Sequence, residues 1–238
     1  MVQPAYGETA RVVRTGNPEI DKKIGGGIPE GSLSLIEGQS DSGKSVLLQQ
    51  LIWGALEEGF RVVYYTTENT TRSLMRQMDS LNMNIMDYYL LGRLNIYAVP
   101  AAMSAEESLN FFNRLLDHMS RNPNYDVAAM DSLTSFVSHV PERDTLSFFT
   151  SCKNICDNYK TILITLHAYA FDESMFIRIR SICDAHLRLR IEEVGDQLVK
   201  VLEAAKVRGA EKSTGNIVSF DIEPGLGMRI VPITKAKA

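Results

Sequence analysis

Residues 38–45 read Gly-Gln-Ser-Asp-Ser-Gly-Lys-Ser, which has the spacing G-x-x-x-x-G-K-[ST]. In loops with this pattern, backbone N–H groups surround the phosphates of a nucleoside triphosphate, and glycine lets the chain approach them closely. Lys44 would bring a compact positive charge to the β- and γ-phosphates, and Ser45 would offer a hydroxyl to Mg²⁺. We therefore predict that the whole loop holds the phosphates, through Gly38, Gln39, Ser40, Asp41, Ser42, Gly43, Lys44 and Ser45.

The segments on either side of this loop have the pattern that such a site needs. Residues 32–37 form a short apolar run typical of a strand, and residues from Val46 to Gly59 repeat apolar side chains at helical spacing. An ordinary glycine turn is the alternative, but it needs neither flanking element. Strand, loop and helix in this order direct the positive end of the helix dipole at the phosphates. The side chain of Asp41 is expected to face outward, because phosphate would repel a carboxylate.

Two acidic residues follow strand-like runs and are expected at the same site. Asp131 follows residues 125–130 and is predicted to hold Mg²⁺ together with Ser45, directly or through a water. Glu68 follows residues 61–67 and is a candidate general base for the water that attacks the γ-phosphate.

Alternative roles remain for Glu68 and for a third candidate. Glu68 could instead cap the following helix, a role equally open to Asn69 or Thr70. His167 ends a strand-like run and is either a γ-phosphate sensor or a histidine bonded to nearby backbone.

The remaining chain alternates strand-like and helix-like segments up to about residue 184 and then contains strand-like segments alone. We expect further strands at 61–67, 94–99, 125–131, 161–166, 184–191, 197–205, 216–222 and 226–231, and further helices at about 70–81, 104–119 and 142–159. This order predicts an α/β fold with a mostly parallel central sheet flanked by helices and a C-terminal antiparallel extension. Arg188 and Arg190 alternate with apolar residues, which predicts a strand near a sheet edge.

Composition limits the class of protein. The chain has 238 residues, 45% of them hydrophobic, which suits one well-buried domain over residues 1–238. Its formal net charge of −4 gives no overall attraction to nucleic acid or to an anionic membrane. Three cysteines without metal-ligand spacing are typical of buried thiols in a reducing compartment, and no apolar stretch approaches a membrane span. We expect a soluble, cytoplasmic protein.

The order of motifs over nearly the whole chain resembles KaiC-like ATPase domains of the RecA superfamily. The likeness lies in Thr15-Gly-Asn-Pro-Glu-Ile-Asp21, Gly25-Gly-Gly-Ile-Pro-Glu-Gly31-Ser, the loop at 38–45, Cys183-Asp-Ala-His-Leu-Arg-Leu and the segment 202–209. The length and the segment Tyr64-Tyr-Thr-Thr-Glu-Asn69 are most similar to the FlaH family of archaeal flagellar (archaellum) accessory proteins. The resemblance implies a cytoplasmic ATP-binding motor component that works beside an assembly ATPase and a membrane-anchored ring.

The resemblance also implies roles for individual residues. Lys44, Ser45 and Asp131 match the family's phosphate and magnesium positions. KaiC-type domains usually carry two adjacent glutamates where this chain has Glu68-Asn69, and the loss of one puts efficient hydrolysis in doubt. Two further residues, Lys206 and Arg208, match an element that reaches the neighbouring subunit's γ-phosphate, which implies a homo-oligomeric ring, commonly a hexamer.

Three functions therefore compete. The first is a nucleotide-gated regulatory or scaffold subunit with slow or absent hydrolysis, and the second is an active ATPase that uses Glu68 as base. The third, a recombinase that binds single-stranded DNA, needs basic side chains and stacking aromatics, of which residues 169–180 contain some together with two acids. The negative net charge disfavours this third function, so no nucleic-acid partner is expected. The preference for ATP over GTP, the ring size and the partner surface stay open, and Tyr88-Tyr-Leu-Leu91 is either a partner patch or part of the core.

Overall fold

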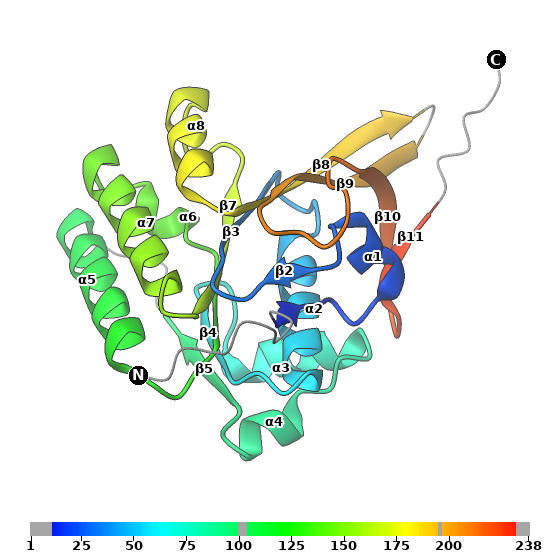
Figure 1. Ribbon diagram of the computed structural model, residues 1–238, viewed down its shortest axis with the longest axis horizontal. Coiled ribbons are helices and arrows are strands. Elements are labelled where there is room, and N and C mark those ends of the chain that lie inside the picture. Colours follow the sequence, from blue (N-terminus) through cyan, green and yellow to red (C-terminus); the bar gives the residue numbers. More distant parts are fainter. Residues whose placement is uncertain (1–10, 100–103, 195–196, 232–238) are drawn as a thin grey trace.

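In the computed structural model, which describes residues 11–99, 104–194 and 197–231, nine strands form one twisted sheet with helices on both faces (Figure 1). Their order across the sheet is β11-β10-β9-β8-β3-β7-β6-β4-β5. The bounds are β3 (Leu33–Gly38), β4 (Val62–Thr66), β5 (Leu94–Ala98), β6 (Val127–Asp131), β7 (Thr161–His167), β8 (Ala185–Val194), β9 (Gln197–Val207), β10 (Ile217–Glu223) and β11 (Gly227–Ile230). A separate two-stranded sheet pairs β1 (Val12–Val13) with β2 (Ile28–Pro29).

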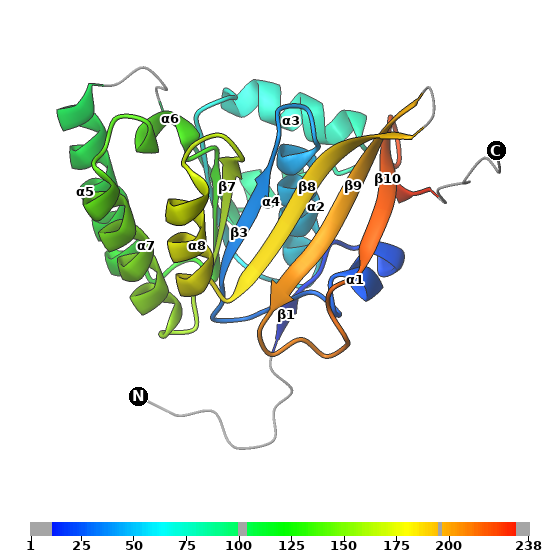
Figure 2. The same cartoon turned by 90° about the horizontal axis from the view of Figure 1, so that it is seen from above.

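The strand directions confirm a mostly parallel sheet with an antiparallel extension. Strands β8, β3, β7, β6, β4 and β5 run parallel, whereas β9, β10 and β11 each pair antiparallel with the preceding strand. The extension therefore begins at β9, one strand later than the sequence pattern indicated. The placement of β8 near a sheet edge was wrong, because it lies between β3 and β9. Its arginines alternate with apolar residues because one face of β8 carries no described helix in Figure 2.

The helices divide between the two faces of the sheet. One face packs against α1 (Pro18–Lys23), α2 (Lys44–Glu57), α3 (Thr71–Ser80) and α4 (Met86–Leu90). The other packs against α5 (Ala105–Arg121), α6 (Thr134–Val137), α7 (Glu142–Cys156) and α8 (Glu173–Ile182). Strand residues alternate between these two apolar cores, as Leu35 and Ile36 do in β3. Because both faces of β3, β7 and β6 are covered, these strands are buried almost throughout.

Local signals explain where two of the helices begin. Thr70 caps α3 and Ser104 caps α5, each in a reciprocal capping box with the residue three positions later. On α7, Cys152 and Cys156 are buried among apolar side chains, as expected. The short helices α1, α4 and α6, and also α8, were not predicted, and α8 occupies the segment that had been considered for DNA binding.

Part of the segment 88–91 lies outside the core. Leu90 and Leu91 at the end of α4 are 71% and 76% exposed. Core packing is therefore the wrong interpretation for these two leucines.

The register of the parallel strands brings the predicted site residues to one edge of the sheet. Gly38 at the end of β3 is the Cα partner of His167 in β7. Thr66 at the end of β4 is likewise the partner of Asp131 in β6. Since these strands run in the same direction, their carboxyl ends and the loops after them meet at this edge.

Candidate functional site

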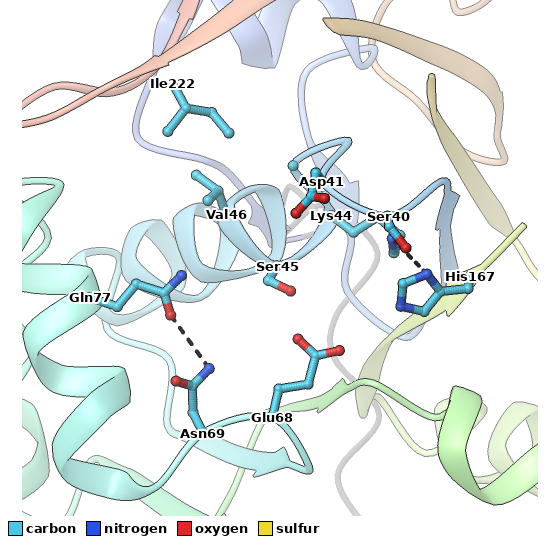
Figure 3. Close-up of a pocket in the computed structure, with 11 residues that line it drawn as sticks. Ser40, Asp41, Lys44, Ser45, Val46, Glu68, Asn69, Gln77, His167 and Ile222 are labelled. Carbon is cyan, nitrogen blue, oxygen red and sulfur yellow. Dashed lines mark hydrogen bonds between the residues drawn. The ribbon is translucent and has the colours of Figure 1, made fainter. Parts of the chain in front are cut away.

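A cleft of about 540 Å³ opens where β3 ends and α2 begins (Figure 3). It brings together residues from the loop 40–46, from the ends of β4 and β7, and from α3 and β10. Its walls are formed by Ser40, Asp41, Gly43, Lys44, Ser45, Val46, Glu68, Asn69, Gln77, His167 and Ile222. Five of the eight predicted loop residues, together with Glu68 and His167, therefore lie around one space.

The loop conformation depends on its two glycines. Gly43 precedes α2 with φ +94°, a left-handed conformation that favours glycine, and a Cβ there would lie 3.2 Å from side-chain atoms of Phe220 and Ile222. A Cβ on Gly38 would lie 2.7 Å from Ser42 Oγ, so the loop folds back closely on itself. The side chain of Asp41 is exposed but lines the cleft, so the expectation that it faces away is only partly met.

Gln39 and Ser42 contribute to the shape of the loop rather than to the cleft wall. The main-chain carbonyl of Gln39 accepts hydrogen bonds from Ser42 Oγ and from Lys44 Nζ. The side-chain oxygen of Gln39 accepts one from the N–H of Ile191 in β8. Gly38, Gln39 and Ser42 therefore fix the path of the loop that faces the cleft.

Lys44 places a buried positive charge at the floor of the cleft. Its side chain is 6% exposed, and Nζ donates to the carbonyl of Gln39 over 2.6 Å. Burial lowers the pKa of Lys44, against the opposing effects of Glu68, Asp131 and Asp41. Lys44 forms no salt bridge with any described residue, so an anion entering the cleft would meet an unpaired ammonium.

Asp131 is held by three hydroxyl groups at the end of β6. Ser45 Oγ and Thr165 Oγ1 each donate to Asp131 Oδ1 over 3.0 Å, and Tyr64 Oη donates to Oδ2 over 2.9 Å. Burial raises the pKa of Asp131, whose side chain is 1% exposed, although these hydrogen bonds and Lys44 oppose the shift. The contact confirms that Ser45 and Asp131 converge, as the prediction of a shared Mg²⁺ required.

Glu68 directs its carboxylate into the cleft toward Ser45 (Figure 3). Thr70 caps α3, so Glu68 is not used as the helix cap. Burial is the main cause that raises the pKa of Glu68. The negative charge of Asp131 raises this pKa further, and the positive charge of Lys44 opposes both effects. A raised pKa favours proton uptake by a carboxylate, as the predicted role of Glu68 requires, and that role stays a prediction.

The neighbouring Asn69 is fixed by hydrogen bonds of its side chain. Its Nδ2 donates to Gln77 Oε1 over 3.4 Å, and its Oδ1 accepts from Ser73 Oγ over 3.0 Å. Gln77 also accepts a hydrogen bond from Gln49 Nε2 on α2. Asn69 is thus held against α3, Gln77 joins α3 to α2, and the amide of Asn69 cannot act as a second base.

His167 lies beside Lys44 at the end of β7. Its Nδ1 is 3.5 Å from Lys44 Nζ, and no described backbone group binds its ring. Burial lowers the pKa of His167, and Lys44 lowers it further, so the ring is neutral near pH 7. Its ring lies 4.9 Å from that of Tyr169, whose hydroxyl is 3.5 Å from Ser40 Oγ.

Lys206 and Arg208 lie near the amino ends of the parallel strands, whereas the cleft lies at their carboxyl ends. Lys206 is the strand partner of His186 near the start of β8, whereas Gly38 aligns with Leu189 further along β8. Lys206 Nζ donates to the carbonyls of Arg180 and Cys183 at the end of α8, and Arg208 Nη1 is 3.5 Å from Asp184 Oδ1. Neither residue lines the cleft of its own chain, and their action on a neighbouring subunit stays a prediction.

Several residues of the site were not found from the sequence. Tyr64 and Thr165 hold Asp131 from within strands, and such interior hydroxyls carry no motif. Gln77 and Ile222 reach the cleft from α3 and β10, far along the chain from the loop. The packing of α3 places Gln77 at the cleft, and the packing of the antiparallel strand β10 places Ile222 there.

The described residues contain no helix that is both long and apolar enough to cross a membrane. Nor do they contain a group of three or more histidine, cysteine, aspartate or glutamate side chains placed to hold a metal ion.

Comparison with known proteins agrees with this geometry. The model of the family described as "ATPase: KaiC" matches residues 13–235. An archaeal flagellar ATP-binding protein FlaH from Sulfolobus acidocaldarius is 32% identical over 95% of this chain and 100% of its own length. This chain belongs to the KaiC-like ATPases and, among them, to the FlaH family.

Other relatives give the same family and fold. A FlaH protein from Methanocaldococcus jannaschii is 31% identical over 89% of this chain and 91% of its own length. The crystal structure of the flagellar accessory protein FlaH from the same organism superimposes with a TM-score of 0.80 at 28% identity, covering 94% of this chain and 100% of that one. A KaiC-like protein from Pyrococcus horikoshii gives a TM-score of 0.74 at 25% identity, covering 94% and 100%. The predicted RecA-like P-loop fold is thereby confirmed.

Proposed function

We propose that this FlaH-family chain binds ATP with Mg²⁺ and acts as a nucleotide-gated regulatory or scaffold subunit of the archaellum motor, with slow or absent hydrolysis. The observation that carries the proposal is the buried, unpaired ammonium of Lys44, which faces a cleft formed by the loop 38–45. Triphosphate oxygens would provide the compensating negative charge, and the N-terminus of α2 would add its dipole.

The site contains suitable groups for Mg²⁺. Ser45 and Asp131 present hydroxyl and carboxylate oxygens at the loop, and Mg²⁺ is commonly bound by one or two such groups together with substrate phosphates. These two residues would hold the ion, which would neutralise charge on the β- and γ-phosphates. Tyr64 and Thr165 orient Asp131 through their hydroxyl groups.

The side chains at the end of β4 that line the cleft support slow turnover. Glu68 is a single carboxylate facing the cleft, and Asn69 beside it is engaged by Gln77 and Ser73. A well-placed general base contributes roughly 10²- to 10⁴-fold to a rate, so a weakened base distinguishes a slow switch from a motor. Neutral His167, 3.5 Å from Lys44, is placed to respond when Lys44 turns toward a γ-phosphate.

We further propose that the subunits form a homo-oligomeric ring with ATP at the interfaces, where Lys206 and Arg208 reach the neighbouring nucleotide. Their position at the far edge of the sheet supports this arrangement, because they cannot complete their own chain's site. Arg208 is better placed than Lys206 to contact a neighbouring subunit, since the side chain of Arg208 is 57% exposed. Ordering of the interface by the γ-phosphate would gate the ring and its contacts with the archaellum assembly ATPase and a membrane-anchored ring, at the cytoplasmic face of the motor.

A second candidate, an active ATPase, is favoured by the raised pKa of Glu68. DNA binding is disfavoured by the charges on α8, where Arg180 pairs with Glu37 and Arg178 lies 3.7 Å from Glu142. These pairs leave the segment with little free positive charge for a phosphate backbone.

Steady-state hydrolysis of ATP with Mg²⁺, measured beside direct ATP binding and with a Glu68→Gln control, tests the proposal. We expect tight binding with turnover far below ~1 s⁻¹, the low end of ordinary enzyme rates, and no change in the control. Brisk turnover that collapses in Glu68→Gln would establish the ATPase instead. Absence of ATP binding would overturn both functions.

A further inference from the structure

A buried acidic residue stands directly before the phosphate loop and takes no part in the site described above. Glu37 is the penultimate residue of β3, immediately before Gly38, and its side chain is 1% exposed. A buried carboxylate is costly unless it is paired, and apolar side chains would fill the same space at less cost. The position of Glu37 therefore suggests a role in geometry rather than in stability alone.

Three basic side chains surround this carboxylate. Arg180 of α8 donates to both oxygens of Glu37, over 2.9 and 2.7 Å, and His186 Nε2 lies 3.0 Å from Oε2. Arg188 is more distant, with Nε 3.8 Å from Oε1. The hydrogen bonds from His186 and Arg180 hold the pKa of Glu37 down at about 2, although burial opposes them. The carboxylate is thus a fixed anion that joins β3 to both α8 and β8.

Arg180 and His186, the two residues closest to the Glu37 carboxylate, both adjoin Lys206. The main-chain carbonyl of Arg180 accepts a hydrogen bond from Lys206 Nζ over 3.0 Å. His186 is the β8 partner of Lys206 across the ladder to β9. Lys206 is therefore connected to the residue before the phosphate loop by two independent routes, one through α8 and one through the sheet.

The first residue of β3 is connected to the same element. The N–H of Leu33 donates to Asp184 Oδ2 over 3.0 Å, and Lys153 Nζ donates to the same oxygen over 2.9 Å. The other oxygen of Asp184 lies 3.5 Å from Arg208 Nη1, and the N–H of Arg208 donates to the carbonyl of Asp184. The six residues of β3 thus have the phosphate loop at one end and contacts to the segment 206–208 at both ends.

We propose that Glu37 is a positioning residue that couples phosphate binding at the loop of its own chain to the basic element formed by Lys206 and Arg208. A short, fully buried strand moves as a unit, so a shift of Gly38 on phosphate binding displaces Glu37 and, through Arg180 and His186, the base of that element. The inference rests on the proposed function. In the proposed ring, ATP bound to one subunit would change how far Lys206 and Arg208 of that subunit extend toward the nucleotide of its neighbour.

Hydrogen–deuterium exchange on the full chain, with and without ATP and Mg²⁺, tests the coupling at protein concentrations too low for assembly. In the wild type we expect ATP to slow exchange both in the loop 38–45 and in the distant segments 180–186 and 206–209. In Glu37→Gln we expect the loop response to persist and the distant response to disappear. A distant response that persists in Glu37→Gln, or that is missing in the wild type, would overturn the coupling.

Two variants separate this result from misfolding. Arg180→Lys keeps the charge and the main-chain carbonyl but loses the two-fold contact, so it tests the same link if Glu37→Gln does not fold. Asp126→Asn breaks another carboxylate–guanidinium pair, the more exposed one that Asp126 forms with Arg61 at the amino ends of β4 and β6, and is expected to respond like the wild type. Loss of both responses in Asp126→Asn would show that the assay reports general loosening, which would overturn the assignment to Glu37.

Assembly measured by mass photometry then connects the coupling to the ring. We expect Glu37→Gln to assemble only at an ATP or protein concentration roughly 5-fold or more above that of the wild type. This shift lies within the 5- to 150-fold range typical of coupling between sites. The ATP affinity of the separate subunit should stay nearly unchanged. Assembly by Glu37→Gln at wild-type concentrations would contradict the proposal while leaving the ring intact. If the loop itself gains no protection with ATP in the wild type, the proposed function fails, and the coupling fails with it.

Discussion

Replacing Lys44 with methionine should weaken ATP binding strongly without weakening the nucleotide-free fold. Methionine retains most of the buried stem of Lys44 and removes only its ammonium group. Burial lowers the pKa of Lys44, so the folded state disfavours its charge at neutral pH. This penalty is present below the folded-state pKa and is relieved as pH rises through it toward the ordinary value. The substitution therefore removes a cost to folding, together with one hydrogen bond to the carbonyl of Gln39.

The effect on binding follows from the burial of Lys44. A hydrogen bond to a charged group contributes about 1.5–3 kcal/mol, and the upper end applies because water does not screen this ammonium. A loss of about 3 kcal/mol corresponds to a Kd raised roughly 100-fold.

Thermal unfolding with and without ATP measures both effects. At an ATP concentration of roughly 1,000 times the wild-type Kd, binding stabilises the wild type by about 4 kcal/mol and the variant by about 1.4 kcal/mol. For a chain of this size, these values correspond to increases in Tm of roughly 8–16 °C and 3–6 °C. An equal ATP-induced shift in Lys44→Met and wild type would refute the assignment of Lys44 as the phosphate anchor. A fall of several degrees in the Tm of the nucleotide-free variant would refute the argument from burial.

Three other perturbations have definite expected outcomes. Arg208→Ala should weaken ATP-dependent assembly, measured by light scattering, while ATP affinity stays near the wild-type value; an unaltered mass distribution would count against its action between subunits. Because the pKa of Glu37 is lowered to about 2, its ion pairs contribute about 3 kcal/mol that is fully present above pH ~4.5 and is lost as pH falls through about 2. Urea unfolding of wild type and Glu37→Gln should therefore give curves that converge as pH falls below ~4.5, and a constant separation would contradict this. Gly54→Ala should destabilise the fold by about 1–3 kcal/mol, because its Cβ would overlap the main-chain carbonyl of Arg14; a thermal unfolding curve unchanged from wild type would disprove that contact.

The sequence identified those parts of the site that depend on local chemistry. The phosphate loop is specified by its own glycines, lysine and serine. Asp131 was found because it ends a buried strand, and Glu68 because it follows one closely. Their convergence follows from the parallel direction of the strands, which the alternation of strands and helices predicts.

What the sequence did not reveal depends on contacts between distant segments. Ile222 reaches the cleft only because β10 packs beside α2 and Gly43, and strand order in an antiparallel extension has no local signal. The helix α8 is an exception: it was missed although Asp172 caps it and its buried residues Met175, Phe176 and Ile179 lie at helical spacing. The polar face of β8 suggested an edge strand because an uncovered sheet face and a sheet edge leave the same alternating pattern.

The β10–β11 hairpin has a consequence for the order in which the site can form during synthesis. Asn17 Nδ2 donates to the carbonyl of Met228, Gln50 Oε1 accepts from the N–H of Met228, and Ile222 completes the cleft wall. The ribosome makes the phosphate loop early in the chain, but the wall that closes over the start of α2 emerges nearly two hundred residues later, which takes ~10–40 s at ordinary elongation rates. A nascent chain therefore displays the phosphate-binding signature well before it can enclose a nucleotide. If the chain binds ATP as proposed, full enclosure of the nucleotide therefore waits until the last strands have been made.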